Sequence, residues 1–239
     1  MVGILSDIGN VRSKNEDAAE FYEDGEMGIY IIADGMGGYN SGEIASTMAV
    51  KEVLSYLKSN INSGKPEVII KEAIINSNLN IYKASLANTE QSGMGTTITA
   101  CIKINGELVV GHVGDSSCLV LNSLGVSKLT KDHSLVQQLV DSGSITEDEA
   151  LTHPKKNIIT RALGTSDFVE IDLYKESMVG IKKIILCTDG LTNFVSNDEI
   201  YDIIICNNNE ETSRKLIQLG KEKGSRDNLS VIVFEGEGI

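Results

Sequence analysis

Residues 28–38 read G-I-Y-I-I-A-D-G-M-G-G, an apolar run that ends in an aspartate followed by glycines. A second stretch, residues 183–190, has the same form, K-I-I-L-C-T-D-G. Short apolar runs bounded by turn residues are typical of buried strands. A glycine after the aspartate lets another backbone segment approach closely or allows a positive φ. The pattern therefore predicts two buried strands that deliver the carboxylates of Asp34 and Asp189 to a sheet edge.

Two further aspartates, Asp17 and Asp227, lie in short polar segments. If several carboxylates gather at one point they need cations, because uncompensated buried charge is very costly. Oxygen ligands favour hard ions such as Mg²⁺ or Mn²⁺. We therefore expect a hydrolytic site that is rich in carboxylates and binds more than one metal ion.

Length and composition are those of a globular protein with a sizeable core. The chain has 239 residues, of which 41% are hydrophobic and 23% charged. It contains two prolines and no low-complexity linker or internal repeat, so we expect one compact domain. The net charge of −13 argues against nucleic acid and anionic membrane as partners.

A cytoplasmic location is expected from the N-terminus and the cysteines. Residues 1–10 lack the charged and then apolar pattern of a signal peptide, and no apolar run approaches the ~18 residues of a membrane span. The four cysteines form no C-x-x-C pair. We interpret them as small buried side chains in a reducing compartment, with a thiol nucleophile or a zinc site as the alternative.

Hydrophobic periodicity predicts mostly strands, with two pairs of helices and one further short helix. Strands are expected at residues 1–6, 21–22, 28–33, 96–104, 108–113, 117–121, 126–129, 169–174, 183–188 and 229–234. Helices are expected after Ser41, from Pro66, and at residues 134–140, 198–206 and 210–221. Residues 144–157 are polar and should form an exposed flap. Strands and helices do not alternate, so the order favours an α+β fold of antiparallel sheets covered by helices.

Short motifs follow one another along almost the whole chain. They are D-x-G-x-x-R-x-x-N-E-D (7–17), A-D-G-M-G-G (33–38), G-M-G-T-T (93–97), G-H-V-G-D-S (111–116), L-T-x-D-H-S (129–134), I-x-R-A-L-G (159–164), C-T-D-G-L-T (187–192) and R-D-N-L-S (226–230). In this order and spacing, the chain resembles the metal-dependent serine/threonine protein phosphatases of type 2C. The similarity is greatest to their compact bacterial members.

The resemblance implies a four-layer αββα sandwich, in which two central antiparallel sheets are flanked by helix pairs. It implies a single phosphatase catalytic domain over residues 1–239, with the flap at about 144–157. The implied reaction is hydrolysis of phosphoserine and phosphothreonine in proteins by a metal-bridging hydroxide. The implied cofactors are two Mn²⁺ or Mg²⁺ ions and a weaker third ion. The implied partners are phosphorylated proteins, including a cognate serine/threonine kinase that the enzyme opposes.

The resemblance also implies a role for each motif residue. The implied ligands of the two central ions are Asp17, Asp34 as the bridge, the backbone carbonyl of Gly35, Asp189 and Asp227. Asp115 would share the third ion with Asp189, and Glu16 would act through a bound water. Arg12 would bind the substrate phosphate, for which the rigid donor fork of a guanidinium is suited.

The chain departs from the family pattern at two positions. Met36 stands where many eukaryotic members have a histidine proposed as general acid, and Ser117 stands where an arginine usually follows G-D-S. We interpret His133 of the D-H-S motif as organising its loop, with acid catalysis as the alternative. Two rival functions remain: a two-metal phosphodiesterase or nuclease, and an inactive binding module.

Overall fold

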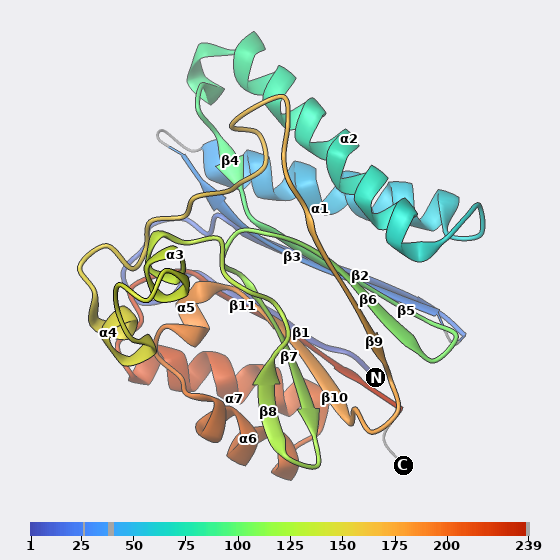
Figure 1. Cartoon of the computed structure of the whole chain (residues 1–239), viewed down its shortest axis with the longest axis vertical. Helices are drawn as coiled ribbons and strands as arrows, with labels where there is room; N and C mark the ends of the chain where they lie inside the picture. The colour runs from blue at the N-terminus through green and yellow to red at the C-terminus, as the bar shows by residue number, and fades with distance from the viewer. Residues whose placement is uncertain (26, 38–40, 238–239) are drawn as a thin grey trace.

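The computed structural model describes residues 1–25, 27–37 and 41–237, in which the strands form two antiparallel sheets (Figure 1). Glu26 and Gly38, which the sequence places in a turn and in the second motif, lie outside the described residues. The first sheet has the order β1 (Gly3–Asp7), β11 (Leu229–Glu235), β10 (Lys183–Cys187), β7 (Ser117–Asn122), β8 (Gly125–Lys128). The second has the order β2 (Asp17–Asp24), β3 (Met27–Met36), β5 (Ile98–Ile104), β6 (Glu107–Val113), β9 (Asp172–Ser177), and the short β4 (Gly95–Thr96) pairs with β3.

Helices cover the outer face of each sheet, and this arrangement confirms the expected four layers (Figure 1). The second sheet is covered by α1 (Ser41–Asn60) and α2 (Pro66–Ala87), and the first by α6 (Asn197–Cys206) and α7 (Asn209–Glu222). On one side of the molecule, α3 (Leu135–Asp141) precedes the flap and α4 (Glu147–Thr152) lies within it. The short segments η1 (Thr89–Gln91) and α5 (Asp189–Thr192) complete the helices of the described chain.

The apolar run of β3 is continuous because this strand is buried on both faces. Ile29 and Ile31 pack with α1 and α2, whereas Tyr30 and Ile32 belong to the core between the two sheets. There the Tyr30 ring stacks on Phe234 of β11, with the ring centroids 3.5 Å apart. Alternating side chains of one strand thus supply two separate cores.

Several element boundaries differ from those that the periodicity predicts. β2 extends over eight residues because the polar residues at its ends also pair with β3. Thr97 interrupts the strand expected at 96–104, and β9 begins at Asp172 rather than at 169, since Val169 and Ile171 pack into the core before the strand starts. The flap contains α4, whose N-terminus is closed by a capping box of Thr146 and Glu149. Val68 and Leu86 of α2 are apolar but exposed.

The two sheets bring the ends of their central strands to one edge. Asp34, near the end of β3, is paired directly with Asp17, the first residue of β2. In the other sheet β10 ends at Cys187 just before Asp189, and its antiparallel neighbours β11 and β7 begin just after Asp227 and Asp115. Antiparallel pairing therefore places aspartates that are far apart in the sequence at the same end of the sandwich. No helix in the described part of the chain is long and apolar enough to cross a bilayer.

Candidate functional site

A cavity of about 270 Å³ opens at this edge and holds most of the residues that the motifs single out. Its walls are Arg12, Glu16, Asp34, Gly35, Met36, Gly37, Thr97, Asp115, Asn157, Ile159, Asp189 and Asp227. Asp17 does not line the cavity but lies buried beside Asp34 in the β2–β3 pair. The structure therefore brings all the predicted site residues to one place.

The cavity concentrates negative charge away from water. Burial raises the pKa of Asp17 from 3.8 to about 7 and that of Asp189 to about 6, and the other carboxylates of the site add to both shifts. Burial likewise raises the pKa of Asp34 and Asp115 well above the usual range, with further contributions from neighbouring aspartates. The site therefore lacks the positive charge that this many carboxylates require.

One arginine supplies part of the missing charge. Arg12 Nη2 donates to Asp227 Oδ2 at 2.8 Å, and the Arg12 side chain is half exposed at the mouth of the cavity. Two other carboxylates have neutral donors: Thr188 Oγ1 donates to Asp17 Oδ2 at 2.9 Å, and Asn193 Nδ2 donates to Asp189 Oδ2 at 2.9 Å.

The chemistry of this donor set fits divalent cations. Oδ1 of Asp17 is buried without a hydrogen-bond partner among the described residues, as expected for an oxygen that a cation would satisfy. Carboxylate and carbonyl oxygens are the ligands that Mg²⁺ and Mn²⁺ prefer. Over the same residues, no three acidic, histidine or cysteine side chains are yet gathered tightly enough to hold an ion.

Both Asp-Gly steps serve close approach of the backbone rather than a positive φ. A Cβ on Gly35 would lie 2.2 Å from the carbonyl oxygen of Gly42. A Cβ on Gly190 would lie 2.0 Å from the carbonyl oxygen of Asn228. Neither glycine has a positive φ, so what each position requires is the absence of a side chain.

The peptide of Asp34 is held by the G-M-G-T-T motif. The β3–β5 pairing ends at Ile32 and Thr99, so the backbone of Asp34 lies beyond the ladder. The Asp34 N–H donates to Thr97 Oγ1 at 2.8 Å, and the Asp34 carbonyl accepts from the Thr97 N–H and from Thr96 Oγ1, both at 2.9 Å. This role of the threonines is not readable from the sequence.

A second residue that sequence reasoning missed is Asn228 of the R-D-N-L-S motif. Its Oδ1 accepts from the Glu16 N–H at 2.9 Å, and its Nδ2 donates to the carbonyl oxygens of Ile8 at 3.0 Å and Lys14 at 2.8 Å. This one buried side chain shapes the loop that carries Arg12 and Glu16. The only sequence signal was its place directly after Asp227.

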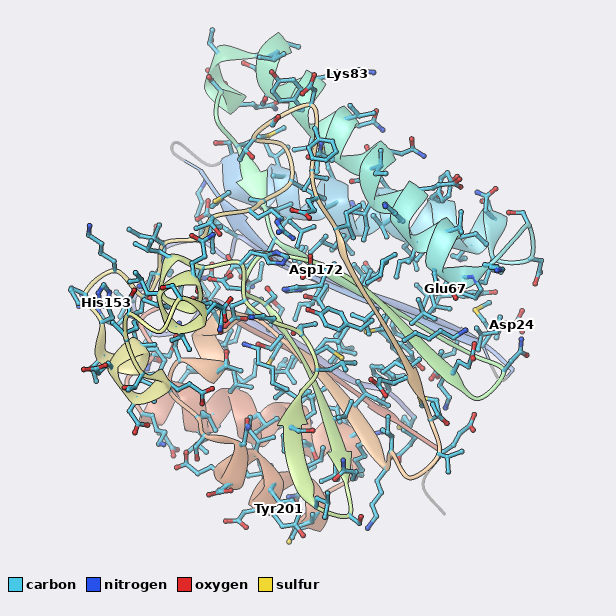
Figure 2. The ribbon with its side chains drawn as sticks, in the orientation of Figure 1. Asp24, Glu67, Lys83, His153, Asp172 and Tyr201 are labelled. Carbon is cyan, nitrogen blue, oxygen red and sulfur yellow. The ribbon has the colours of Figure 1, made fainter. Side chains whose placement is uncertain are left out.

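The flap borders a second hollow beside the cavity. This hollow has a volume of about 440 Å³ and shares Asp115 and Asp189 with the cavity. Its other walls include Val136 and Val140 of α3 and Leu151 of α4. Figure 2 shows His153, just after α4, at the outer side of the flap. The flap is thus placed to contact whatever extends out of the cavity.

A model of the protein phosphatase 2C family matches residues 10–220 of the chain. The serine/threonine phosphatase stp of Listeria welshimeri is 34% identical over 235 residues, covering 96% of this chain and 93% of that protein. The crystal structure of the serine/threonine phosphatase Stp1 from Staphylococcus aureus superposes with a TM-score of 0.91 at 33% identity, covering 99% of this chain and 95% of that one. The catalytic domain of the phosphatase PstP in complex with two manganese ions superposes with a TM-score of 0.86 at 32% identity, covering 98% and 96%.

Proposed function

This chain belongs to the protein phosphatase 2C family and is a protein serine/threonine phosphatase, and we propose that the carboxylate-lined cavity is its active site. The observation that carries the proposal is the collection of buried aspartates, raised in pKa by burial and by one another, around a single arginine. Such an arrangement is poorly stable by itself and becomes favourable when cations occupy it.

The residues that would hold two divalent cations are Asp17, Asp34, the backbone carbonyl of Gly35, Asp189 and Asp227. Asp115, which lines the cavity together with Asp189, would hold a weaker third ion, and Glu16 would accept a hydrogen bond from a water of the site. Bound Mn²⁺ or Mg²⁺ ions would supply an activated water and would neutralise charge on the phosphoryl group. The relative with two manganese ions supports two sites of this kind.

Arg12 is the group that would bind the substrate phosphate. Its guanidinium now pairs with Asp227, a residue that we assign to the metal centre. A cation on Asp227 would compete with this ion pair and leave the donor fork free for phosphate oxygens. Met36, which lies in the cavity wall, has no group able to donate a proton to the leaving alcohol.

The rival functions fit less well. A net charge of −13 disfavours a polyanionic nucleic-acid substrate. An inactive binding module would have no need to keep four costly aspartates at one edge, all of which are present. We further propose that the substrates include a cognate serine/threonine kinase. A cytoplasmic location is also proposed, and the four free cysteines favour it.

The test is release of inorganic phosphate from a phosphothreonine peptide, with Mn²⁺ and with EDTA. We expect release that needs Mn²⁺ and stops in EDTA, with no cleavage of DNA or RNA under the same conditions. The matched control is Asp202→Asn, which removes a surface carboxylate beside α7 and should leave release unchanged. Folded protein that releases no phosphate at any Mn²⁺ or Mg²⁺ concentration would refute the assignment.

A further inference from the structure

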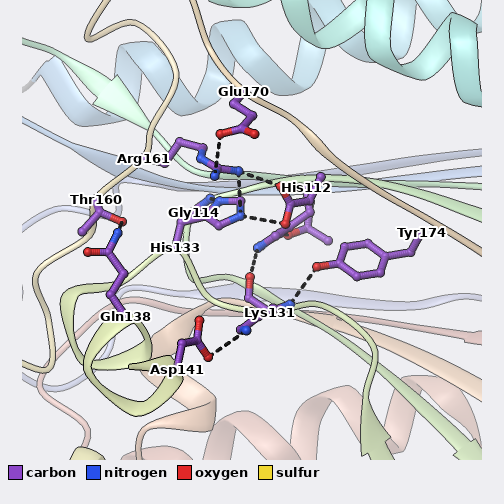
Figure 3. Close-up of polar contacts among 12 residues, drawn as sticks. His112, Gly114, Lys131, His133, Gln138, Asp141, Thr160, Arg161, Glu170 and Tyr174 are labelled. Carbon is purple, nitrogen blue, oxygen red and sulfur yellow. Dashed lines mark hydrogen bonds and ion pairs between the residues drawn. The ribbon is translucent and has the colours of Figure 1, made fainter. Parts of the chain in front are cut away.

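The D-H-S motif, residues 132–134, places a buried histidine against the loop that carries Asp115. His133 is 7% exposed and is absent from the walls of both hollows. Gly114, the residue before Asp115, lies beside His133 (Figure 3). The His133 N–H donates to the Gly114 carbonyl oxygen at 2.7 Å, and the Gly114 N–H donates to His133 Nδ1 at 3.0 Å.

The Gly114 N–H contact assigns the tautomer of the ring. A backbone N–H can only donate, so Nδ1 carries no proton and the neutral ring is protonated on Nε2. Nε2 lies 3.2 Å from Oδ2 of Asp172, to which it can donate, and 2.9 Å from Nη1 of Arg161, which is itself a donor. Arg161 Nη1 donates to Oδ1 of the same carboxylate at 2.7 Å. Asp172, at the start of β9 near the middle of the molecule (Figure 2), therefore orients both side chains.

The other side of Gly114 is closed by Thr97. Gly114 has a φ of +112°, and a Cβ at this position would lie 2.5 Å from the Thr97 side chain. Thr97 Oγ1 also lies 2.9 Å from Ser116 Oγ, on the residue after Asp115. The segment 114–116 is thus held by Thr97 on one side and by His133 on the other.

His133 also lies at the base of the flap. Its carbonyl oxygen accepts from the Thr160 N–H at 2.7 Å, and the Leu135 N–H donates to the Ile158 carbonyl oxygen at 2.8 Å. These bonds join the chain that enters the flap to the chain that leaves it. Ser134 then caps α3 by accepting from the Gln137 N–H at 3.2 Å. A single residue therefore connects the flap base to the peptide before Asp115.

We propose that His133 is a positioning residue that fixes the Gly114–Asp115 peptide, and through it the direction in which the Asp115 carboxylate meets the cavity. The proposal rests on the proposed function, in which Asp115 holds a third and weaker cation. Acid catalysis by His133 does not fit this geometry, because its ring is buried and both ring nitrogens have partners inside the protein.

The test compares two substitutions of His133, each of which keeps one contact of the ring and loses the other. In His133→Asn, the amide oxygen can occupy the place of Nδ1 and accept from the Gly114 N–H. In His133→Gln, the longer side chain reaches toward Asp172 and leaves the Gly114 N–H without an acceptor. Substituting a residue that orients a metal ligand without binding the ion itself commonly lowers metal affinity by about 10–100-fold. We therefore expect His133→Gln to weaken the weakest Mn²⁺ site about tenfold and His133→Asn to retain it.

Mn²⁺ binding is measured by titration calorimetry on the full chain, with thermal unfolding recorded for each variant. Asp115→Asn should abolish the weakest site, and adding His133→Gln to it should change Mn²⁺ binding no further. Tyr174→Phe is the matched control. It removes a hydroxyl that accepts from the Lys131 N–H at 3.1 Å in the same network without touching Gly114, so it should leave Mn²⁺ binding unchanged.

The outcomes separate this inference from the proposed function. If the wild-type protein binds no Mn²⁺, both this inference and the proposed function are refuted. Normal wild-type binding together with an unchanged weak site in His133→Gln, or with no effect of Asp115→Asn, overturns the inference alone. If His133→Gln fails to fold, ¹⁵N NMR of the wild-type imidazole tests the inference instead. An unprotonated Nδ1 supports the hydrogen bond from the Gly114 N–H, and a protonated Nδ1 overturns the inference.

Discussion

Thr97→Val should destabilise the protein and loosen the metal centre, although valine has nearly the shape of threonine. The substitution removes the only acceptor that the Asp34 N–H has among the described residues, at 2.8 Å, in a position beyond the end of the β3–β5 ladder. A buried donor left without a partner costs about 1–3 kcal/mol. The hydroxyl of Ser116 also loses a contact at 2.9 Å, which adds about 1 kcal/mol. The expected loss of unfolding free energy is therefore about 2–4 kcal/mol.

The chain offers a matched control in Thr212→Val. Thr212 is fully buried, and its hydroxyl has no hydrogen-bond partner among the residues described. The same substitution there removes an unsatisfied group, so it should be neutral or slightly stabilising. Both variants are compared by urea unfolding in EDTA and by Mn²⁺ titration. If Thr97→Val unfolds within about 0.5 kcal/mol of Thr212→Val and binds Mn²⁺ like wild type, the role assigned to Thr97 is wrong.

Three further outcomes are expected. Asp34→Ala should abolish turnover and weaken Mn²⁺ binding, and a wild-type kcat in a phosphopeptide assay would contradict its assignment. Arg12→Ala should mainly raise KM for phosphopeptides, because a phosphate contact also present before the reaction is lost; unchanged KM and kcat would remove Arg12 from the site. In EDTA, stability should decline between about pH 4 and pH 7. The folded-state pKa values of about 7 for Asp17 and about 6 for Asp189 exceed 3.8, so the unfolded chain releases protons that the folded chain keeps. Unfolding at about pH 5 and about pH 7.5, with and without Mn²⁺, checks this, and a rise of stability with pH in EDTA would contradict it.

The sequence predicted most of the sheet strands because their burial leaves a local signal. β3 and β10 are buried on both faces, so their apolar runs are continuous and end visibly at Asp34 and Asp189. The polar ends of β2 carry no such signal, since its extent is set by pairing with β3. Short segments such as α5 were missed because they are shorter than the window over which periodicity can be recognised.

The aspartates of the site could be named from the motifs, but the contacts that hold them could not. Asn228 shapes the loop before Asp17 from more than 200 positions away, and Thr97 holds Asp34 across 63 positions. Hydrogen bonds between such distant segments impose no period and no local composition on the chain.

By itself, the sequence determined which carboxylates end the buried strands, the class of fold, and a chemistry that needs hard cations. The tertiary structure alone decided how those carboxylates are held: Thr97 on the peptide of Asp34, and His133 on the peptide before Asp115. The physical reason is that each buried position of a strand carries an apolar residue, so burial can be read from the sequence one residue at a time. The direction of a carboxylate, by contrast, depends on neighbours that become adjacent only when the two sheets pack together.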